Sequence, residues 1–316
     1  MSSSTLSGQH RFINAVYYPS WRIYRGLAPS SLQLDSINRV FYGFARLNED
    51  GTLRLLDPHA DLAIAADGEQ GCLAALAKHQ HRHHLHHHLQ TLVAPRRRGR
   101  ACRAFVDEHG LDGVDIDWEH PATAHDGVNY IALLRALRAA LPADAYCLQH
   151  ITLPAAAQLP DSLNLMAYDF TGPWTDASGH HAQLLTPPGE DLHSAERHSG
   201  HGGVEYLLAH NFPPQDRAHG PGQPFGEAAE MDYCELPADW IRDARVDGEV
   251  CAASYVDHAP DGKGFVSFDV PETVRRKAEY VRHMGLGGLF YWTGVGDVMG
   301  PGSLVRAGFE ALNING

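Results

Sequence analysis

The sequence predicts an α/β protein built around a parallel sheet. Along its 316 residues, short segments with strand character alternate with segments of helical periodicity. Neighbouring parallel strands cannot be joined by a tight turn and need a crossover, usually a helix, so this alternation favours parallel strands. The length fits either two ordinary domains or one α/β barrel of roughly 250 residues, and the motifs have to decide between them.

The N-terminal part contains three expected strands. Residues 12–18 and 40–45 are rich in β-branched and aromatic residues, and Pro19 ends the first of them. Residues 89–93 form a third candidate strand. Residues 73–78, between the second and third strands, favour a helix.

The middle of the chain continues this alternation. Residues 101–109 have helical spacing, and Gly110 is suited to end that helix. A strand is expected at 113–118 and a helix at 128–141, where apolar residues recur at i, i+3, i+4 and i+7. Another strand is expected at 163–168.

The C-terminal part ends with one more helix and strand. Pro271 is suited to begin the helix and Gly285 to end it, and residues 289–292 form the strand. Between residues 231 and 267, short mixed segments indicate a small α+β insertion. Two stretches rich in Gly, Pro, His and Ser are expected to be long loops on the functional face: 173–203 and 211–226.

Composition narrows the class of partner. The chain has 38 acidic against 25 basic residues, a formal net charge of -13, which argues against nucleic acid or an anionic membrane. Residues 1–10 lack a secretory signal and no stretch approaches roughly 18 apolar residues, so we expect a cytoplasmic protein without membrane spans. The five cysteines, never in C-x-x-C spacing, indicate neither disulfides nor a zinc site.

The most informative segment, 112–119, has the sequence Asp-Gly-Val-Asp-Ile-Asp-Trp-Glu. Strand side chains alternate between faces, so its last three acids share one face, at intervals of about 6.6 Å, and its apolar residues share the other. Because like charges this close cannot all ionise without cost, we expect at least one proton to be retained near neutral pH, as a general acid requires. The candidate catalytic acids are Asp115, Asp117 and Glu119.

Two other interpretations of this strand stay open. It could be a solvated edge strand with an acidic face, although the flanking apolar residues argue against that. Three carboxylates could also hold Mg²⁺ or Ca²⁺, although Trp118 and the lack of other nearby oxygen-rich motifs argue against a metal.

Residues 111–121, LDGVDIDWEHP, resemble the DGxDxDWE signature of the family-18 glycoside hydrolases, the chitinase family, at every signature position. The chain is most similar to fungal chitinases. Four further segments resemble the family's first, second, sixth and eighth strands: 15–21 (AVYYPSW), 40–45 (VFYGFA), 163–169 (LNLMAYD) and 287–297 (GGLFYWTGVGD).

The resemblance implies a TIM (β/α)8 barrel over residues 12–316, with an α+β insertion at about residues 220–268. It implies hydrolysis of the β-1,4 bonds between N-acetylglucosamine units of chitin or chito-oligosaccharides, with retention of configuration. No cofactor and no metal are implied, and we expect a monomer. Many members of the family are extracellular, in contrast to the cytoplasmic expectation from residues 1–10.

The family's mechanism is substrate-assisted. By resemblance, Glu119 protonates the leaving oxygen while the substrate's own acetamido carbonyl attacks the anomeric carbon. Asp117 would orient and stabilise the resulting oxazolinium-like ion, and Asp115 would share a proton with Asp117. Tyr168 matches the tyrosine that holds the acetamido oxygen, and Asp169 would line the same subsite.

Four aromatic residues are expected to bind the sugar. Trp292 matches the family tryptophan beneath the distorted sugar ring, where an aromatic face meets axial C–H groups. Tyr18, Trp21 and Phe44 match aromatics of the first two strands that line the cleft. Plain core packing is the alternative for each of them, above all for Tyr18 and Phe44.

Three parts of the family pattern are missing. The third strand is truncated, because residues 89–93 run into Ala-Pro-Arg-Arg-Arg in place of a Gly-rich turn. No fifth strand follows residues 145–146, and no seventh strand lies between 211–215 and 220–225. A closed barrel that loses strands exposes unpaired edges, so we expect a gene model that treats coding sequence as intron, or else a decayed copy.

Seven of the ten residues from His79 to His88 are histidine. The pairs His79/His83 and His84/His88 have the i, i+4 spacing of metal ligands on a helix. We favour a low-complexity surface expansion over a metal site.

The sequence leaves two alternatives to a hydrolase. One is a non-catalytic chitin-binding lectin of the same fold, against which the presence of Glu119 argues. The other is an inactive, truncated product.

Overall fold

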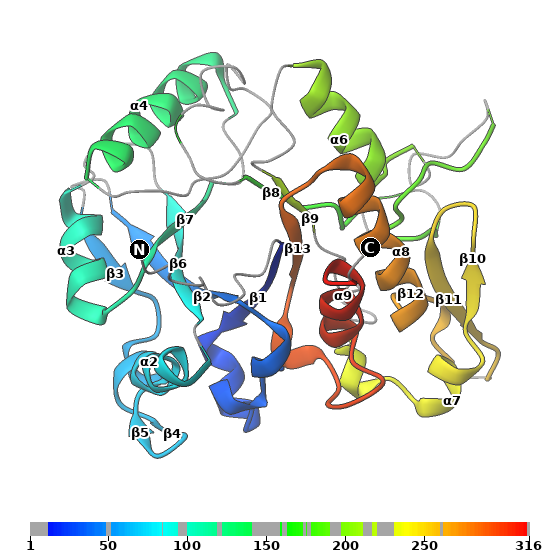
Figure 1. The fold of residues 1–316 in the computed structure, drawn as a ribbon, viewed down its shortest axis with the longest axis horizontal. Helices are drawn as coiled ribbons and strands as arrows, with labels where there is room; N and C mark the ends of the chain where they lie inside the picture. Colours follow the sequence, from blue (N-terminus) through cyan, green and yellow to red (C-terminus); the bar gives the residue numbers. More distant parts are fainter. Residues whose placement is uncertain are drawn as a thin grey trace, which may run out of the picture.

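The computed structural model describes residues 12–48, 52–83, 85–93, 100–118, 122–140, 159, 163–172, 175, 178–189, 197–210, 217–219, 231–259 and 262–314. Strands surround the middle of the molecule, and helices α3, α4, α6 and α8 lie outside them (Figure 1). Within the described ranges, no helix combines the length and the apolar character needed to cross a membrane.

Seven strands form one curved sheet in the order β7-β6-β2-β1-β13-β9-β8, and every neighbouring pair on this path runs parallel. The predicted parallel sheet is therefore confirmed. The strands β7 and β8 are the two ends of this order, and no ladder joins them in the described residues. The strands on the path are β1 (Ile13–Pro19), β2 (Arg39–Leu47), β6 (His86–Val93), β7 (Gly113–Asp117), β8 (Leu163–Leu165), β9 (Arg217–His219) and β13 (Gly288–Tyr291). An eighth strand, β3 (Leu53–Leu55), pairs antiparallel with β2.

The helices are α1 (Pro58–Leu62), α2 (Cys72–His83), α3 (Arg100–His109), α4 (Ala124–Ala140), α6 (Gly200–Ala209), α7 (Ala238–Arg242), α8 (Pro271–Met284) and α9 (Leu304–Leu312). Short 3₁₀ helices are η1 (Ser20–Arg25), η2 (Pro29–Ser31), η3 (Leu34–Ser36), η6 (Tyr233–Glu235) and η7 (Gly294–Gly296). The expected ends of α3 and α8 are confirmed, since Gly110 and Gly285 follow them with φ of 63° and 66°. Glycine adopts this left-handed conformation without strain.

The two faces of the sheet carry different buried clusters. Because strand side chains alternate, neighbours in one strand belong to different clusters. The inner cluster, which faces the middle of the ring of strands, consists of Ala15, Tyr17, Phe41 and Phe290, with Ile13, Met166, Tyr168 and Trp292 packed against it. The outer core, between the sheet and the helices, includes Val16, Tyr18, Val40, Tyr42, Val114 and Ile116.

The structure corrects three sequence-based expectations. The third strand is longer than residues 89–93: β6 has eight residues and pairs with both β2 and β7. The seventh strand is present as the three-residue β9, which pairs with β13 on one side and β8 on the other. The end of the first expected loop, residues 200–203, is the first turn of helix α6, which Ser199 caps by accepting a hydrogen bond from Gly202 N.

Two expected features lie outside the described residues. They are the position of the missing fifth strand, between β7 and β8 after residue 140, and the turn that follows Val93.

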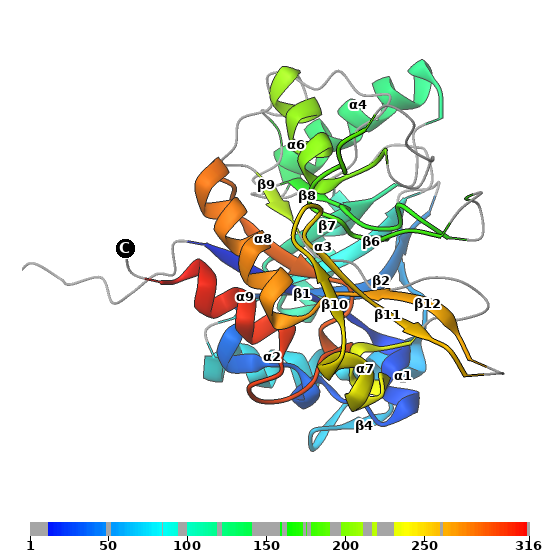
Figure 2. The ribbon, with the colours of Figure 1, turned by 90° about the vertical axis from the view of Figure 1, so that its right-hand side faces the viewer.

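A second, antiparallel sheet lies beside helix α8. It has the order β10-β11-β12, with bounds Arg245–Asp247, Ala252–Asp257 and Gly264–Phe268. Figure 2 shows its strands next to α8 and α7. A two-stranded ladder of β4 (Ala65–Ala66) and β5 (Glu69–Gln70) precedes α2.

Candidate active site

Strand β7 carries two of the candidate acids into the protein interior. Asp115 and Asp117 are both buried. Val114, Ile116 and Trp118 belong to the outer core, as the alternation predicts. Glu119 follows directly in the sequence and lies outside the described residues.

The carboxylate of Asp115 is bonded to residues from two other strands. The hydroxyl of Tyr17 on β1 donates to Asp115 Oδ2 at 2.8 Å. The amide of Asn164 on β8 donates to the same tyrosine oxygen at 3.0 Å and to Asp115 Oδ1 at 3.4 Å. Since β7 and β8 are the two ends of the sheet path, these bonds join the ends of the curved sheet across its interior.

Tyr17 is held in its protonated form. Burial, followed by the negative charge of Asp115, raises the pKa of Tyr17 well above its usual value. The tyrosine is therefore a hydrogen-bond donor throughout the physiological range. Tyr17 and Asn164 are residues of the candidate site that the sequence analysis missed, and the place of Tyr17 next to Tyr18 on an alternating strand was the available signal.

Tyr18, expected in the cleft, lies on the opposite face of β1. It is fully buried in the outer core, its ring stacks on Tyr42 at 6.1 Å, and its hydroxyl donates to the carbonyl oxygen of Leu27 at 2.9 Å. The sulfur of Cys72 lies 3.6 Å from that hydroxyl. Because consecutive residues of a strand point to opposite faces, Tyr17 and Tyr18 cannot both face the interior.

The other expected aromatics form a row that leads outward from the inner cluster. The ring of Trp292 lies 5.5 Å from that of Tyr17 and 5.8 Å from that of Phe44, measured between centroids. Phe44 in turn stacks on Trp21 at 5.6 Å. Trp21 is 41% exposed, so this row runs from the buried acids to the surface.

Tyr168 and Asp169 follow β8 and are partly buried. The ring of Tyr168 meets Phe290 of the inner cluster edge to face at 6.1 Å. Asp169 has a positive φ of 61°, an uncommon conformation for a residue with a side chain. The structure thus brings Tyr168 to the same interior as Asp115 and Trp292.

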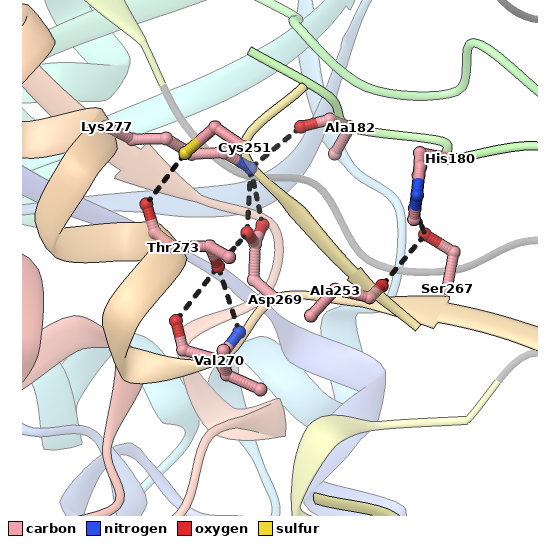
Figure 3. A network of polar contacts seen from close by, with 9 residues as sticks. All are labelled: His180, Ala182, Cys251, Ala253, Ser267, Asp269, Val270, Thr273 and Lys277. Atoms are coloured by element: carbon pink, nitrogen blue, oxygen red, sulfur yellow. Dashed lines mark hydrogen bonds and ion pairs between the residues drawn. The ribbon is translucent and has the colours of Figure 1, made fainter. Parts of the chain in front are cut away.

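A buried ion pair anchors the segment that follows Tyr168 (Figure 3). The nitrogen of Phe170 donates to the carbonyl oxygen of His181 at 3.0 Å, and Lys277 Nζ donates to the carbonyl oxygen of Ala182 at 2.7 Å. Lys277 also contacts both carboxylate oxygens of Asp269 at 2.8 Å. The segment is therefore tied to helix α8.

The imidazole of His181 is enclosed in the same region. Burial, then the charge of Lys277, lowers the pKa of His181 to about 3. The imidazole ring of His181 is therefore neutral at physiological pH.

A pocket of about 220 Å³ lies next to Trp292. One side comes from η1 and the other from residues 231–235 around η6. An ion pair joins the two sides, because Arg22 binds Asp232 through both of its terminal nitrogens. A second pair, Arg25–Glu235, lies at 3.7 Å and is exposed.

The period of a 3₁₀ helix explains this arrangement. With three residues per turn, side chains at i and i+3 point the same way. Ser20 and Ile23 face the core, whereas the arginines at 22 and 25 face the acids of η6. Trp21 shares the third direction with Tyr24.

Of the two histidine pairs with i, i+4 spacing, only His79 and His83 lie together on one helix, α2, where their ring centroids are 6.3 Å apart. Helix α2 ends at His83 and His88 belongs to β6, so the pair His84/His88 does not lie on one helix. His79 is buried, in contrast to a surface expansion, and its Nε2 lies 3.1 Å from Asp67; His83 contacts Asp35. In the described part of the chain, no group of three His, Cys, Asp or Glu residues could hold a metal ion.

The interior can therefore supply acidic and hydrogen-bonding groups beside an aromatic wall. Asp115 is held by hydrogen-bond donors, and Asp117, two residues further along the same strand, is also buried. Trp292 lies beside Tyr17 and forms one side of this interior. Such a set suits a neutral, polar substrate with apolar C–H faces, such as a sugar.

Comparisons with known proteins agree with this description. The family model described as "Glycosyl hydrolases family 18" matches residues 13–297. "Endochitinase 1" of Metarhizium robertsii is 26% identical over 376 aligned positions, which cover 98% of this chain and 87% of the relative. "Chitinase 1" of Aphanocladium album is also 26% identical, covering 95% of this chain and 85% of the relative.

Solved structures show the same fold. The Group IV chitinase of Ostrinia furnacalis superimposes with a TM-score of 0.77 at 20% identity, covering 95% of this chain and 99% of that one. A chitinase from Cycas revoluta in complex with (GlcNAc)3 gives a TM-score of 0.74 at 17% identity, covering 95% and 99%.

Proposed function

The chain belongs to family 18 of the glycosyl hydrolases, and from that premise we propose that it hydrolyses the β-1,4 bonds of chitin or chito-oligosaccharides with retention of configuration. The observation that carries the proposal is the buried pair Asp115 and Asp117 on β7, of which Asp115 is fixed by Tyr17, just before Glu119 in the sequence. The chitinases among its relatives and the sugar complex of the Cycas enzyme support the substrate class.

The proposed first step uses the substrate as nucleophile. The acetamido carbonyl oxygen attacks the anomeric carbon, the glycosidic bond breaks, and Glu119 gives its proton to the leaving oxygen. Asp117 holds the acetamido nitrogen and stabilises the positive charge of the oxazolinium-like ion. Tyr168 and Asp169 line the pocket of the acetamido group.

In the second step, water attacks the anomeric carbon from the opposite face, and the bond between that carbon and the acetamido oxygen breaks, which regenerates the acetamido group. This second inversion restores the original configuration, and the Glu119 carboxylate takes the proton of the water and returns to its acid form. Asp115 shares a proton with Asp117, and the hydroxyl of Tyr17, which donates to Asp115, favours a negative charge on Asp115. Trp292 supports the apolar face of the distorted sugar, and Phe44 and Trp21 extend that wall.

The catalytic domain in this proposal spans residues 12–316, with an insertion at about residues 220–268. The separate antiparallel sheet β10–β12, beside α7, supports the insertion. No cofactor takes part, and the enzyme acts as a monomer.

The proposal also includes a barrel without a fifth strand and without the Gly-rich turn after the third. The alignment with the Metarhizium enzyme supports the absence of internal segments from this chain, because the alignment extends over 376 positions whereas this chain has 316 residues. We attribute the shortage to coding sequence treated as intron. Sequencing the transcript across codons 94–96 and 146–148 tests this, and a message that matches the present sequence would contradict it.

Turnover of a defined chito-oligosaccharide tests the activity. We expect the unmodified chain to cleave it with retention, Glu119→Gln to abolish cleavage, and Glu108→Gln, the same change at an exposed residue of α3, to leave it intact. Binding without turnover would instead identify a lectin. Aggregation on expression would indicate a chain too incomplete to fold.

A further inference from the structure

Helix α2 carries two histidines that lie one turn apart. His79 and His83 have the i, i+4 spacing of two ligands of one ion, and their ring centroids are 6.3 Å apart, with 47° between the ring planes. Two imidazoles that bind one ion have centroids roughly 5–6 Å apart, because each metal–nitrogen bond is about 2.0 Å long. The two rings therefore need only a small rotation to share an ion.

Each of the two rings has a carboxylate at one of its nitrogens. Nε2 of His79 lies 3.1 Å from Asp67, and Nδ1 of His83 lies 3.1 Å from Asp35. In protein metal sites, a carboxylate typically binds the ring nitrogen that does not bind the metal, which fixes the orientation of the ring and makes it a better ligand. Both histidines thus have the partner that a metal-binding histidine typically has.

The second nitrogen of His79 is buried. The residue is 8% exposed, and its Nδ1 has no hydrogen-bond partner among the residues that the structure describes. Leaving a buried polar nitrogen unpaired costs free energy, so this nitrogen points to a bound group. For His83, whose Nδ1 contacts Asp35, the nitrogen that remains for a metal is Nε2. The His83 side chain is 28% exposed, which gives an ion access from the solvent.

The two carboxylates come from segments outside the histidine run. Asp67 lies between β4 and β5, where Ser30 N donates to it at 2.9 Å, and Asp35 lies in η3. Figure 1 shows β4 and β5 beside α2. A low-complexity expansion does not explain these partners, because they are far from the run in the sequence. The pairing therefore favours a metal site over the surface expansion that the sequence alone indicated.

The histidine pair lies on the outer side of the sheet, away from the candidate acids. Cys72, Leu73 and Leu76 of the same helix belong to the outer core, whereas Asp115 is bonded to Tyr17 of the inner cluster. A ligand held by α2 is thus separated from the candidate active site by the sheet itself.

We propose that His79 and His83 bind one divalent late transition-metal ion, whose coordination is completed by water. Imidazole suits Cu²⁺, Ni²⁺ and Zn²⁺, and a given set of ligands binds Cu²⁺ most tightly of the three. Through Asp67 and Asp35, the bound ion ties α2 to the turn between β4 and β5 and to η3. It takes no part in the hydrolysis.

Calorimetric titration of the full chain with CuCl₂, after treatment with EDTA and dialysis, tests the site. Losing only the carboxylate behind a histidine ligand typically weakens metal binding about tenfold to a hundredfold, and we expect this of Asp67→Asn. Losing a ligand should weaken binding at least as much, so the affinity of the tightest site should fall about tenfold or more in His79→Gln and in His83→Ala. Because His83 is partly exposed, His83→Ala decides the question even if His79→Gln does not fold.

The matched control is His81→Ala. His81 lies on the same helix, two positions from each proposed ligand, so it lacks the i, i+4 spacing to both. Its replacement should change the affinity less than twofold, and the electron paramagnetic resonance spectrum of the first Cu²⁺ equivalent should still show coupling to two imidazole nitrogens. Equal affinity in His83→Ala and the unmodified chain would overturn the inference. An equal loss in His81→Ala and His83→Ala would also overturn it, because it would identify adventitious binding by the histidine run.

Discussion

Tyr17 on β1 donates its hydroxyl hydrogen to Asp115 on β7 at 2.8 Å, although β2 and β6 separate the two strands in the sheet. Such a contact is possible only because the sheet curves back on itself, so that inner-face side chains of distant strands converge. Asn164 on β8 completes the set from the other end of the sheet. The candidate acids are therefore positioned by the curvature of the whole sheet.

Replacing Tyr17 with Phe removes one hydrogen bond to the Asp115 carboxylate. A hydrogen bond to a charged group contributes about 1.5–3 kcal/mol, so we expect kcat to fall roughly tenfold to a hundredfold. The pH profile of kcat should also move, because the charge on Asp115 loses a donor. Steady-state kinetics on a chito-oligosaccharide from pH 4 to 9 checks both.

The neighbouring Tyr18→Phe variant is the control for that experiment. Tyr18 lies in the outer core and bonds to Leu27, so its loss should lower thermal stability and change kcat much less. A decrease in kcat equal to that of Tyr17→Phe would contradict the placement of the two tyrosines on opposite faces.

Breaking the ion pair across the pocket should affect substrate binding. Arg22→Met leaves the buried carboxylate of Asp232 without its bidentate partner, which lets η1 and η6 separate. We expect KM for a chito-oligosaccharide to rise several-fold, with a smaller change in kcat. Arg25→Met should have less effect, since the Arg25–Glu235 pair is exposed. Equal changes in KM would show that the buried pair has no special part in shaping the pocket.

Lys277→Met should destabilise the fold. The Lys277 and Asp269 side chains are 8% and 4% exposed, and removing one member of such a pair leaves a buried, uncompensated charge at a cost of about 3–5 kcal/mol. The double variant Lys277→Met/Asp269→Asn should recover part of the loss. Urea unfolding measures the free energies, and a double variant less stable than the single one would refute this account.

Asp61 should make the stability depend on pH. Burial raises the pKa of Asp61 to about 6, so the folded protein holds this proton more tightly than the unfolded chain, whose aspartates titrate near pH 4. The stabilisation is complete below about pH 4 and is lost as the pH rises through 6. Asp61→Asn keeps an acceptor for Tyr42, and it should reduce the difference in melting temperature between pH 4.5 and pH 7.5.

Asp107→Asn serves as the control for Asp61→Asn. Asp107 is exposed on α3 and bonds to Arg103, so its replacement should leave the difference in melting temperature as in the unmodified chain. An unchanged difference in Asp61→Asn would mean that Asp61 is not the group responsible.

Much of the fold was predictable from local patterns. The helix ends at Gly110 and Gly285 depend on one residue's conformational freedom, and β7 follows from a run of alternating acids and apolar residues. β9 was not predictable, because three residues between loops carry no periodicity. The extent of β6 was masked by its histidines, which are poor indicators of strand or helix.

The candidate site was predictable only where a single segment defined it. By itself, the sequence predicted that Asp115 and Asp117 share one face of a strand that leads into Glu119, and that Tyr168 and Trp292 follow strands of the same sheet. Because side chains alternate along β1, the sequence also required Tyr17 and Tyr18 to point to opposite faces of the sheet. It did not determine which of the two faces the acids.

Tertiary structure decided the rest. The curvature of the sheet turned Tyr17 inward and brought it to Asp115, and the approach of η6 to η1 joined Arg22 to Asp232. Tyr17 and Asp115 are 98 positions apart in the sequence, and Arg22 and Asp232 are 210 positions apart. Such contacts leave no local pattern in a sequence, because they depend on how distant strands and loops converge in space.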